Sequence, residues 1–319
     1  MEFSIISMLL SLGLAYISYP KFIAYLEAQN SQQQVSEYAL DAFKNKKKTP
    51  TFGGVIFVIV PIVVALATNG FHYDSDLFLL LFVFGSYGLI GFIDDYKIVT
   101  EGKNDGLSPR SKMFMQLVLA VIFYIFYMMS GGDNSISIPF TTKSIDLGIL
   151  YLPFIMFMFS GSSNAVNLTD GMDGLAGGTS IIALIPLIVV AYQTKNSLII
   201  GLVSILGGLI AFLFYNRKPA KIFMGDVGSL SLGAMLAAAS VLMDMEVLYA
   251  IIGGVFVIET LCVIIQKISW KTRKKRIFKY TPIHYSFTLS GWNEEDVVKL
   301  FYAVGLVFMV IGLVLIAIS

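Results

Sequence analysis

Apolar residues form long runs along the whole chain, and short polar segments separate these runs. A membrane-spanning helix needs about 20 predominantly apolar residues. The pattern predicts ten spans, an all-α fold and one integral membrane domain over residues 1–319. Between two of the spans, segment 131–146 is expected to form a small strand pair. The predicted spans are 3–26, 53–69, 77–93, 113–130, 147–163, 176–192, 197–214, 227–243, 247–266 and 300–318.

Composition favours the bilayer as the solvent of this chain. The 319 residues are 56% hydrophobic and 13% charged, and the mean hydropathy is +0.79. Soluble domains carry about 25% charged residues. The chain has no basic patch interleaved with aromatic residues, which is the pattern that would indicate nucleic-acid binding. Its one cysteine, Cys262, cannot form an intramolecular disulfide, and no Cys/His spacing of a zinc site is present. The apolar N-terminus has no basic segment and no cleavage site, so we interpret it as a retained first helix.

The distribution of Lys and Arg predicts the orientation of the spans. If the N-terminus lies outside, the inside segments hold 19 of the 22 Lys and Arg residues. An even number of spans then places both termini outside. The dense polar motifs lie in the same inside segments, so a functional site is expected on the cytoplasmic side. These segments are 27–52, 94–112, 164–175, 215–226 and 267–299.

The first polar motif is the pair Asp94 and Asp95 at the inner end of the third predicted span. Carboxylates at the end of an apolar run are costly unless they are hydrated, paired or bound to a metal. Adjacent acids suit Mg²⁺, which takes oxygen ligands and bridges phosphates. A solvated helix end that only terminates the span is the alternative.

The second motif is the Gly-rich segment 164–178, NAVNLTDGMDGLAGG, in which Asn164, Asn167, Asp170 and Asp173 recur at every third residue. Such side chains can bind ribose hydroxyls, a base edge or a Mg²⁺-bound water. The glycines permit close approach of the backbone to a ligand. A helix N-cap is the alternative, but a cap accounts for only one of the two acids.

The third motif is segment 216–233, where Asp226 lies in a Gly-Asp-Val-Gly turn just before the eighth predicted span. A carboxylate there can reach a metal, and the following helix N-terminus favours anions such as phosphate. An N-cap is again the alternative. Phe223 in the same segment either belongs to the core or stacks on a base.

Two basic inside segments complete the pattern. Residues 271–279 suit anionic lipid headgroups, a lipid phosphate or a pyrophosphate, and they equally suit a simple topological anchor. His284 follows them in a polar loop, whereas His72 lies in an outside loop and is interpreted as structural. Lys46 to Lys48, before the TPTFGG turn, can contact phosphates or hold the topology.

Carboxylates, amides and lysines thus gather at one membrane face. The chain has no Ser-His-Asp pattern, no dinucleotide fingerprint and no P-loop, and the last absence argues against an ATPase. The combination suits Mg²⁺-assisted phosphoryl transfer, in which positioning and charge stabilisation dominate. A transporter or lipid flippase is the alternative from another class. It predicts acids near the bilayer midplane, where Glu259 is the clear example.

Five sequence blocks resemble the signatures of the phospho-N-acetylmuramoyl-pentapeptide transferases, a family of polyprenyl-phosphate N-acetylhexosamine-1-phosphate transferases. They are TPTFGG, GFIDDY, NAVNLTDGMDGLAGG, KIFMGDVGSLSLG and RIFKYTPIH with the later F.L.GW, in family order over residues 49–292. The resemblance implies ten helices, a homodimer and the bacterial cytoplasmic membrane. It also implies Mg²⁺-dependent transfer of phospho-MurNAc-pentapeptide from UDP-MurNAc-pentapeptide to undecaprenyl phosphate. The products would be UMP and lipid I, in the first membrane step of peptidoglycan synthesis.

The resemblance also assigns roles to individual residues. Asp94 and Asp95 would lie near the acceptor phosphate, with Asp94 as base or positioning group, and Asp226 and Asp170 would hold Mg²⁺. Transfer would be direct or pass through an aspartyl phosphate. We favour direct transfer, since Mg²⁺ and a phosphate nucleophile need no covalent help. The residues implied in substrate binding are Lys46, Thr51, Lys112, Asn167, Asp170, Asp173, Asn216, Phe223 (stacked on uracil), Gln266 and His284.

The chain departs from the family at two adjacent positions of the fifth block. The family usually has three successive histidines after the proline, and this chain reads His284-Tyr285-Ser286. A UDP-GlcNAc:polyprenyl-phosphate transferase and a non-catalytic relative that binds nucleotide or lipid therefore stay open as alternatives. The NLTDGMDGLAGG block and the F.L.GW ending favour the muramoyl branch.

Overall fold

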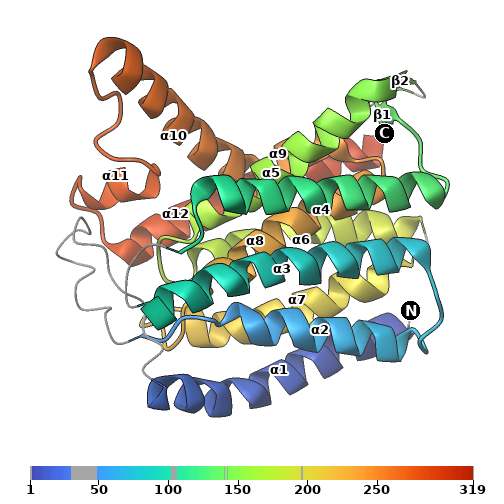
Figure 1. The fold of residues 1–319 in the computed structure, drawn as a ribbon, viewed down its shortest axis with the longest axis horizontal. Coiled ribbons are helices and arrows are strands. Elements are labelled where there is room, and N and C mark those ends of the chain that lie inside the picture. The colour runs from blue at the N-terminus through green and yellow to red at the C-terminus, as the bar shows by residue number, and fades with distance from the viewer. Residues whose placement is uncertain are drawn as a thin grey trace.

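The computed structural model describes residues 2–29, 49–101, 106–139, 141, 143–194 and 197–318. The predicted all-α membrane fold is confirmed, with helices throughout the described ranges and two short strands (Figure 1). The elements are α1 (Glu2–Ala28), α2 (Gly54–Thr68), α3 (Ser75–Glu101), α4 (Pro109–Met129), β1 (Ser135–Ser137), β2 (Ser144–Asp146), the 3₁₀ helix η2 (Gly148–Leu150), α5 (Tyr151–Thr169), α6 (Leu175–Gln193), α7 (Leu198–Asn216), α8 (Gly225–Leu242), α9 (Glu246–Ile252), α10 (Gly254–Arg273), α11 (His284–Thr288) and α12 (Glu294–Ile318).

Eight helices of the described part are long and apolar enough to cross a membrane, namely α1, α3 to α8 and α12. The other two predicted spans differ from the expectation. Helix α2 has only 15 residues, and 247–266 is a pair of helices, α9 and α10, bent by 80°. The break falls at Gly253 and Gly254, where glycine weakens the helix. The apolar run hides this bend because glycine does not interrupt its hydropathy.

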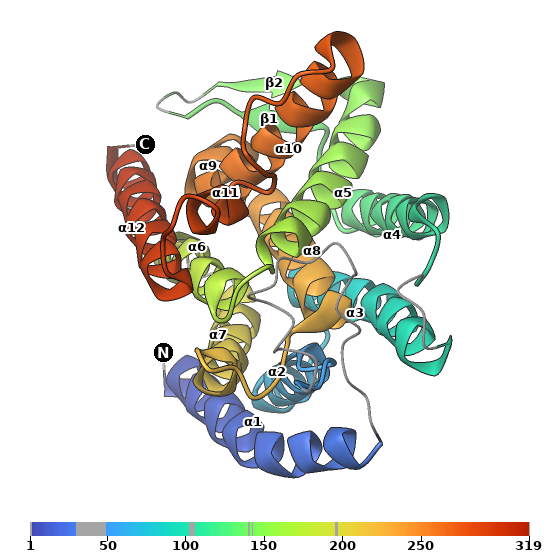
Figure 2. The same ribbon diagram turned by 90° about the vertical axis from the view of Figure 1, so that its left-hand side faces the viewer.

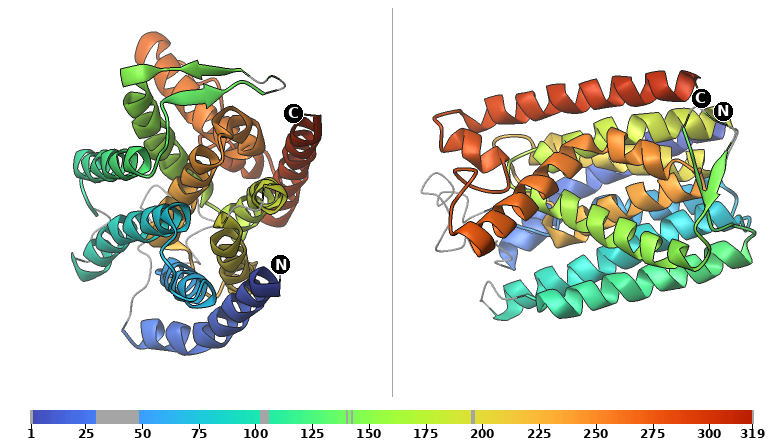
Figure 3. Two further views of the ribbon diagram at one scale, coloured as in Figure 1. Left: turned by 90° about the vertical axis from the view of Figure 1, so that its right-hand side faces the viewer. Right: turned by 90° about the horizontal axis from the view of Figure 1, so that it is seen from above.

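Both chain termini lie at the same end of the bundle (Figures 1 and 3). An even number of membrane crossings places both termini on the same side. Which side of the membrane they face stays a prediction. The predicted strand pair is also confirmed, because β1 and β2 pair antiparallel with Ser135 opposite Asp146. This hairpin lies at the end of the bundle that carries the termini (Figure 1).

Helix α8 forms the centre of the bundle, and the other helices surround it (Figure 2). Every residue from Val227 to Val241 is buried. Small residues permit this close packing. A Cβ at Gly91 of α3 would overlap the backbone of Asp226, and one at Gly233 would overlap the backbone of α5. Helices α3 and α5 therefore meet α8 backbone to backbone.

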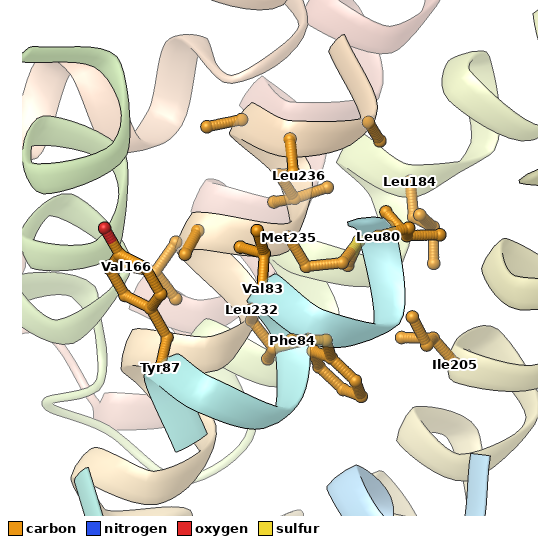
Figure 4. Packing of buried hydrophobic residues seen from close by; sticks show 14 of the residues in the cluster. Leu80, Val83, Phe84, Tyr87, Val166, Leu184, Ile205, Leu232, Met235 and Leu236 are labelled. Carbon is orange, nitrogen blue, oxygen red and sulfur yellow. The ribbon is translucent and has the colours of Figure 1, made fainter. Parts of the chain in front are cut away.

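Larger apolar side chains fill the space between these contacts. Val83 and Tyr87 of α3 are fully buried, and the side chains of α3 lie against Leu232 and Met235 of α8 (Figure 4). The outer helices are different, because much of α1 and α12 is apolar and exposed. Such faces suit lipid rather than water, so the packing supports a multi-pass membrane protein.

Candidate functional site

Three carboxylates converge where the C-terminal part of α3 meets the start of α8. Ligand oxygens of Asp94, Asp95 and Asp226 all lie within 4.8 Å of one another. The close contact at Gly91 brings the first turn of α8 against the last turns of α3. Gly225 precedes Asp226 with φ +71°, a conformation that glycine adopts without strain. A Cβ at that position would overlap the carboxylate of Asp95, so glycine is also needed for space.

Lys112 bridges two of these carboxylates. Its Nζ lies 2.5 Å from Oδ2 of Asp226 and 3.0 Å from Oδ2 of Asp94. Lys112 belongs to the first turn of α4, which Ser108 caps by accepting a hydrogen bond from the Ser111 backbone. The backbone N–H of Leu107 donates to the other oxygen of Asp94 at 2.7 Å. The start of α4 therefore covers the acids at the end of α3.

Asn167 of α5 supplies a fourth contact to the cluster. Its Nδ2 donates to Oδ1 of Asp226 at 2.7 Å and to Oγ of Ser229 at 2.9 Å. Both oxygens of Asp226 are thereby held, one by an amide and one by an ammonium. Asp170 lies one turn beyond Asn167 as the C-cap of α5 and is outside the group of three carboxylates. Asn164 donates instead to the side chain of Gln116, at 2.9 Å.

Asp173 and Asn216 connect two loops rather than joining the acidic cluster. The Ala220 backbone donates to Oδ2 of Asp173 at 3.1 Å. The Gly174 backbone donates to Oδ1 of Asn216 at 2.9 Å, and Asn216 donates to the carbonyl of Ile222. Both side chains are buried. These hydrogen bonds connect the α5–α6 loop to the α7–α8 loop. They therefore position the backbone that leads to Asp226.

The TPTFGG turn pairs with the segment before Asp226. Phe223 donates from its backbone to the carbonyl of Pro50 at 2.8 Å, and its own carbonyl accepts from Gly53. Thr51 is buried, and its hydroxyl faces Gly225 beside Asp95. Phe223 is half-buried. Lys46, the remaining predicted residue of this block, lies outside the described residues.

His284 is fully buried against Glu259 of α10. Its Nδ1 lies 2.9 Å from Oε1 of Glu259, whose other oxygen accepts from the Ile283 backbone at 2.7 Å. The hydroxyl of Tyr285 donates to the carbonyl of Gly171 at 3.2 Å, and burial raises the pKa of this phenol. The fifth sequence block thus packs on the third, NAVNLTDGMDGLAGG. Glu259 orients His284, and its only signal in the sequence is an acid within an apolar segment.

Gln266 has a different environment from the acidic cluster. Its Oε1 accepts hydrogen bonds from the backbones of Ile277 and Phe278 at 3.0 and 3.1 Å. It holds the segment that follows α10 against the end of that helix. The described contacts therefore do not bring Gln266 to the carboxylates.

The acidic cluster fits a hard divalent cation. Three carboxylates and one ammonium carry a formal net charge of −2, and all candidate ligand atoms are oxygens, which Mg²⁺ prefers. Asp94, Asp95 and Asp226 are the residues that could hold the ion. Asp170, the second metal ligand implied by the resemblance, lies outside this group, and its part in metal binding stays a prediction.

Comparison with known proteins gives the class of this membrane protein first. Residues 77–244 match the family model described as glycosyl transferase family 4. These residues include all three carboxylates, Lys112 and Asn167. The polar centre at one end of the bundle therefore belongs to a membrane-embedded transferase.

Curated relatives over almost the full length then define the family. The phospho-N-acetylmuramoyl-pentapeptide-transferase of Geobacillus sp. (strain WCH70) is 43% identical over 312 residues, which cover 97% of this chain and 96% of that protein. The protein of the same name from Halalkalibacterium halodurans is 42% identical over 315 residues, covering 98% and 97%. This chain belongs to the phospho-N-acetylmuramoyl-pentapeptide transferases. The predicted family and enzyme class are confirmed, and the transporter alternative is wrong.

Proposed function

We propose that this protein transfers phospho-MurNAc-pentapeptide from UDP-MurNAc-pentapeptide to undecaprenyl phosphate in the bacterial cytoplasmic membrane, with Mg²⁺ as cofactor. The products are lipid I and UMP. The observation that carries the proposal is the group of three carboxylates at one end of the helix bundle, two of which Lys112 bridges. A site there can receive a nucleotide from water and a lipid phosphate from the bilayer. We also infer a homodimer, on the family resemblance alone.

The reaction is a displacement at phosphorus. An oxygen of the acceptor phosphate attacks the β-phosphorus of the donor, and the bond from that phosphorus to the bridging oxygen of UMP breaks. Asp226 would hold Mg²⁺, with Asp94 and Asp95 beside it, and the bound ion would neutralise phosphate charge. Lys112 supplies a fixed positive charge next to the same carboxylates. Such preorganised charge favours a transition state in which negative charge spreads over phosphate oxygens.

Asp94 and Asp95 serve in this proposal as positioning carboxylates for direct transfer. Asp94 already accepts from Lys112 and from the Leu107 backbone, and Asp95 accepts from the Val227 backbone at 3.2 Å. Carboxylates held in this way are poorer nucleophiles than free ones, because each hydrogen bond stabilises the charge that would attack. The contacts therefore support direct attack by the acceptor over an aspartyl-phosphate intermediate.

The donor is assigned to the surface between the second and third motifs. Asn167 and Asp170 stand on one side, and Phe223 and Thr51 stand on the other beside Asp226 and Asp95. Phe223 would stack on uracil, and Lys46 would contact phosphate. Asp173, Asn216 and His284 would act through the loops that they hold. Gln266 would reach the substrate only at the far end of α10.

A second donor is a specific alternative, because the fifth block departs from the family. The stretch His284-Tyr285-Ser286 lacks two histidines, and Tyr285 makes a backbone contact to Gly171 instead. The alternative is transfer of GlcNAc-1-phosphate from UDP-GlcNAc. A relative that binds nucleotide or lipid without catalysis is the third outcome.

Mg²⁺-dependent release of UMP tests the proposal. The purified protein is given undecaprenyl phosphate with either UDP-MurNAc-pentapeptide or UDP-GlcNAc, and UMP is measured by chromatography. We expect release with the muramoyl donor, loss of release in Asp226→Asn, and retention in Asp133→Asn. The control makes the same chemical change in the loop before β1, at the opposite end of the bundle. Release only with UDP-GlcNAc supports the second donor, and release with neither donor refutes the enzymatic proposal.

A further inference from the structure

Helix α10 carries an unusual concentration of positive charge away from the acidic cluster. It leaves the bundle after the 80° bend from α9 and projects outward (Figures 1 and 2). Residues 260–293 contain seven Lys and Arg residues and no Asp or Glu. The chain therefore supplies no neutralising charge within this stretch.

A pocket of about 320 Å³ lies at the end of this helix. Gln266 builds it, because its side-chain oxygen accepts from the Ile277 and Phe278 backbones and folds that segment back on α10. Lys274 makes the reversal with φ +53°. The pocket is lined by Gln266, Lys267, Trp270, Arg276, Lys279 and Tyr280.

Three cations of the pocket have no ion pair with a carboxylate in the part of the chain that the structure describes. Among the described residues, the ion pairs do not involve Lys267, Arg276 or Lys279. The ammonium of Lys279 donates to the hydroxyl of Ser290 at 2.8 Å. Like charges around one hollow repel each other, and an anion bound among them removes the repulsion. The pocket is therefore complementary to a phosphate.

The surface leading to the pocket is apolar and exposed. Leu261, Ile264, Ile265 and Ile268 of α10 are each more than 40% exposed, and so is Trp270 at the pocket. Tryptophan prefers the level of the lipid headgroups, and apolar side chains before it suit acyl chains. Cations, an aromatic ring and an apolar helix face in this order match a lipid with a negatively charged headgroup.

We propose that this pocket binds the headgroup of an anionic membrane phospholipid such as phosphatidylglycerol, with its acyl chains along α10. None of the pocket residues belongs to the carboxylate cluster, and Gln266 is the one among them that the family resemblance implies in substrate binding. The function of the pocket would be to hold the projecting helix at the membrane surface. The inference does not depend on the transfer reaction, and binding alone tests it.

Trp270 gives a direct measurement, because the chain has only two tryptophans. Trp292→Phe leaves Trp270 as the fluorescent residue of a full-length protein in nanodiscs of phosphatidylcholine. Brominated phosphatidylglycerol or brominated phosphatidylcholine then replaces part of the lipid, and bromine quenches a tryptophan in contact with it. We expect half-quenching at a mole fraction at least about fivefold lower for phosphatidylglycerol, the effect of one Lys or Arg near the surface.

A matched pair of triple variants separates the pocket from general attraction. Lys267→Gln, Arg276→Gln and Lys279→Gln together should abolish the preference for phosphatidylglycerol. Lys271→Gln, Arg273→Gln and Lys275→Gln remove the same number and types of charge outside the pocket and should retain it. Quenching by brominated phosphatidylcholine should be unchanged in both, which verifies folding and insertion.

Three results would overturn the proposal. One is equal quenching by the two brominated lipids in the protein with native cations. Another is an equal loss of preference in the two triple variants, which would mean that only net charge matters. The third is displacement of phosphatidylglycerol by a much smaller amount of undecaprenyl phosphate, which would assign the pocket to the acceptor substrate.

Discussion

Replacing Lys112 with Gln should tighten the binding of a divalent cation while slowing transfer. The ammonium lies 2.5 Å from Asp226 and 3.0 Å from Asp94, so it occupies the same carboxylate oxygens that a metal would use. Gln retains hydrogen bonding but removes the charge. The formal charge of the cluster then changes from −2 to −3, and a dication gains from that change.

The size of the effect follows from the short distances. Two unit charges at about 4 Å interact by about 4 kcal/mol at an effective dielectric of about 20. The Lys112 side chain is 20% exposed, so solvent screens part of this energy. One third of this interaction energy still corresponds to about a tenfold change in the affinity for the divalent cation. Transfer should fall by about a hundredfold or more, because one preorganised charge near the reacting phosphates is lost.

The assay measures Mn²⁺ binding without substrate, through the electron paramagnetic resonance of the free ion. We expect a dissociation constant at least about tenfold lower in Lys112→Gln than in the native protein. Lys112→Arg keeps the charge and should stay near the native value, and Asp226→Asn should bind more weakly. Unchanged or weaker binding in a folded Lys112→Gln would refute the electrostatic reasoning, because the lysine would then be part of the scaffold.

Three further changes test the packing and the buried charges, each by thermal melting. Gly91→Val should lower the free energy of unfolding by about 3 kcal/mol because its side chain would overlap the start of α8, whereas Gly13→Val, with nothing within 4 Å of its Cβ, should change little. Glu259→Gln should cost about 2 kcal/mol by weakening two buried hydrogen bonds, one of them to His284. Desolvation raises the pKa of Asp244, so its ionisation above the unfolded pKa of about 3.9 disfavours the folded state. Asp244→Asn should therefore raise the melting temperature at pH 7, and the gain should shrink towards zero as the pH falls to about 4.

Hydropathy predicts the membrane-spanning helices, except where a break in the backbone bends an apolar segment. Eight predicted spans appear as long helices, because an apolar segment in lipid must satisfy its backbone hydrogen bonds internally. The prediction of one continuous helix over 247–266 was wrong, because the helix breaks at Gly253 and Gly254. Hydropathy does not distinguish a continuous helix from a sharp bend at two adjacent glycines.

The residues of the site were easier to predict than their partners. Asp94, Asp95 and Asp226 are marked by the polarity of the helix ends on which they lie. Lys112 resembles any other positive-inside lysine, and only the family resemblance distinguished it. Its contact with Asp226 spans 114 positions of the chain and depends on the backbone contact at Gly91. That contact is a property of three-dimensional packing, which periodicity does not encode.

Asp173 and Asn216 illustrate a second limit of motif reasoning. The pattern of short polar side chains on a Gly-rich turn predicts ligand contacts for Asp173, and the family resemblance implies them for Asn216. In the structure, both residues hold backbone groups of neighbouring loops, and their contacts with a ligand stay a prediction. A buried amide or carboxylate requires hydrogen-bond partners wherever it lies. The same residue types therefore serve a loop junction and a ligand equally well, and only coordinates distinguish the two uses.

The charge of the cluster itself argues for a cation in the reaction. In the proposed reaction, the donor diphosphate and the acceptor phosphate are both anions, and the carboxylate cluster that they would approach already carries a formal −2. Within the described ranges, Lys112 is the cationic side chain paired with it. One ammonium cannot offset three carboxylates and two phosphorylated substrates in a partly dehydrated site. A bound dication would reverse the local balance, which is why removal of Lys112 and removal of the metal should have distinguishable effects on binding and on transfer.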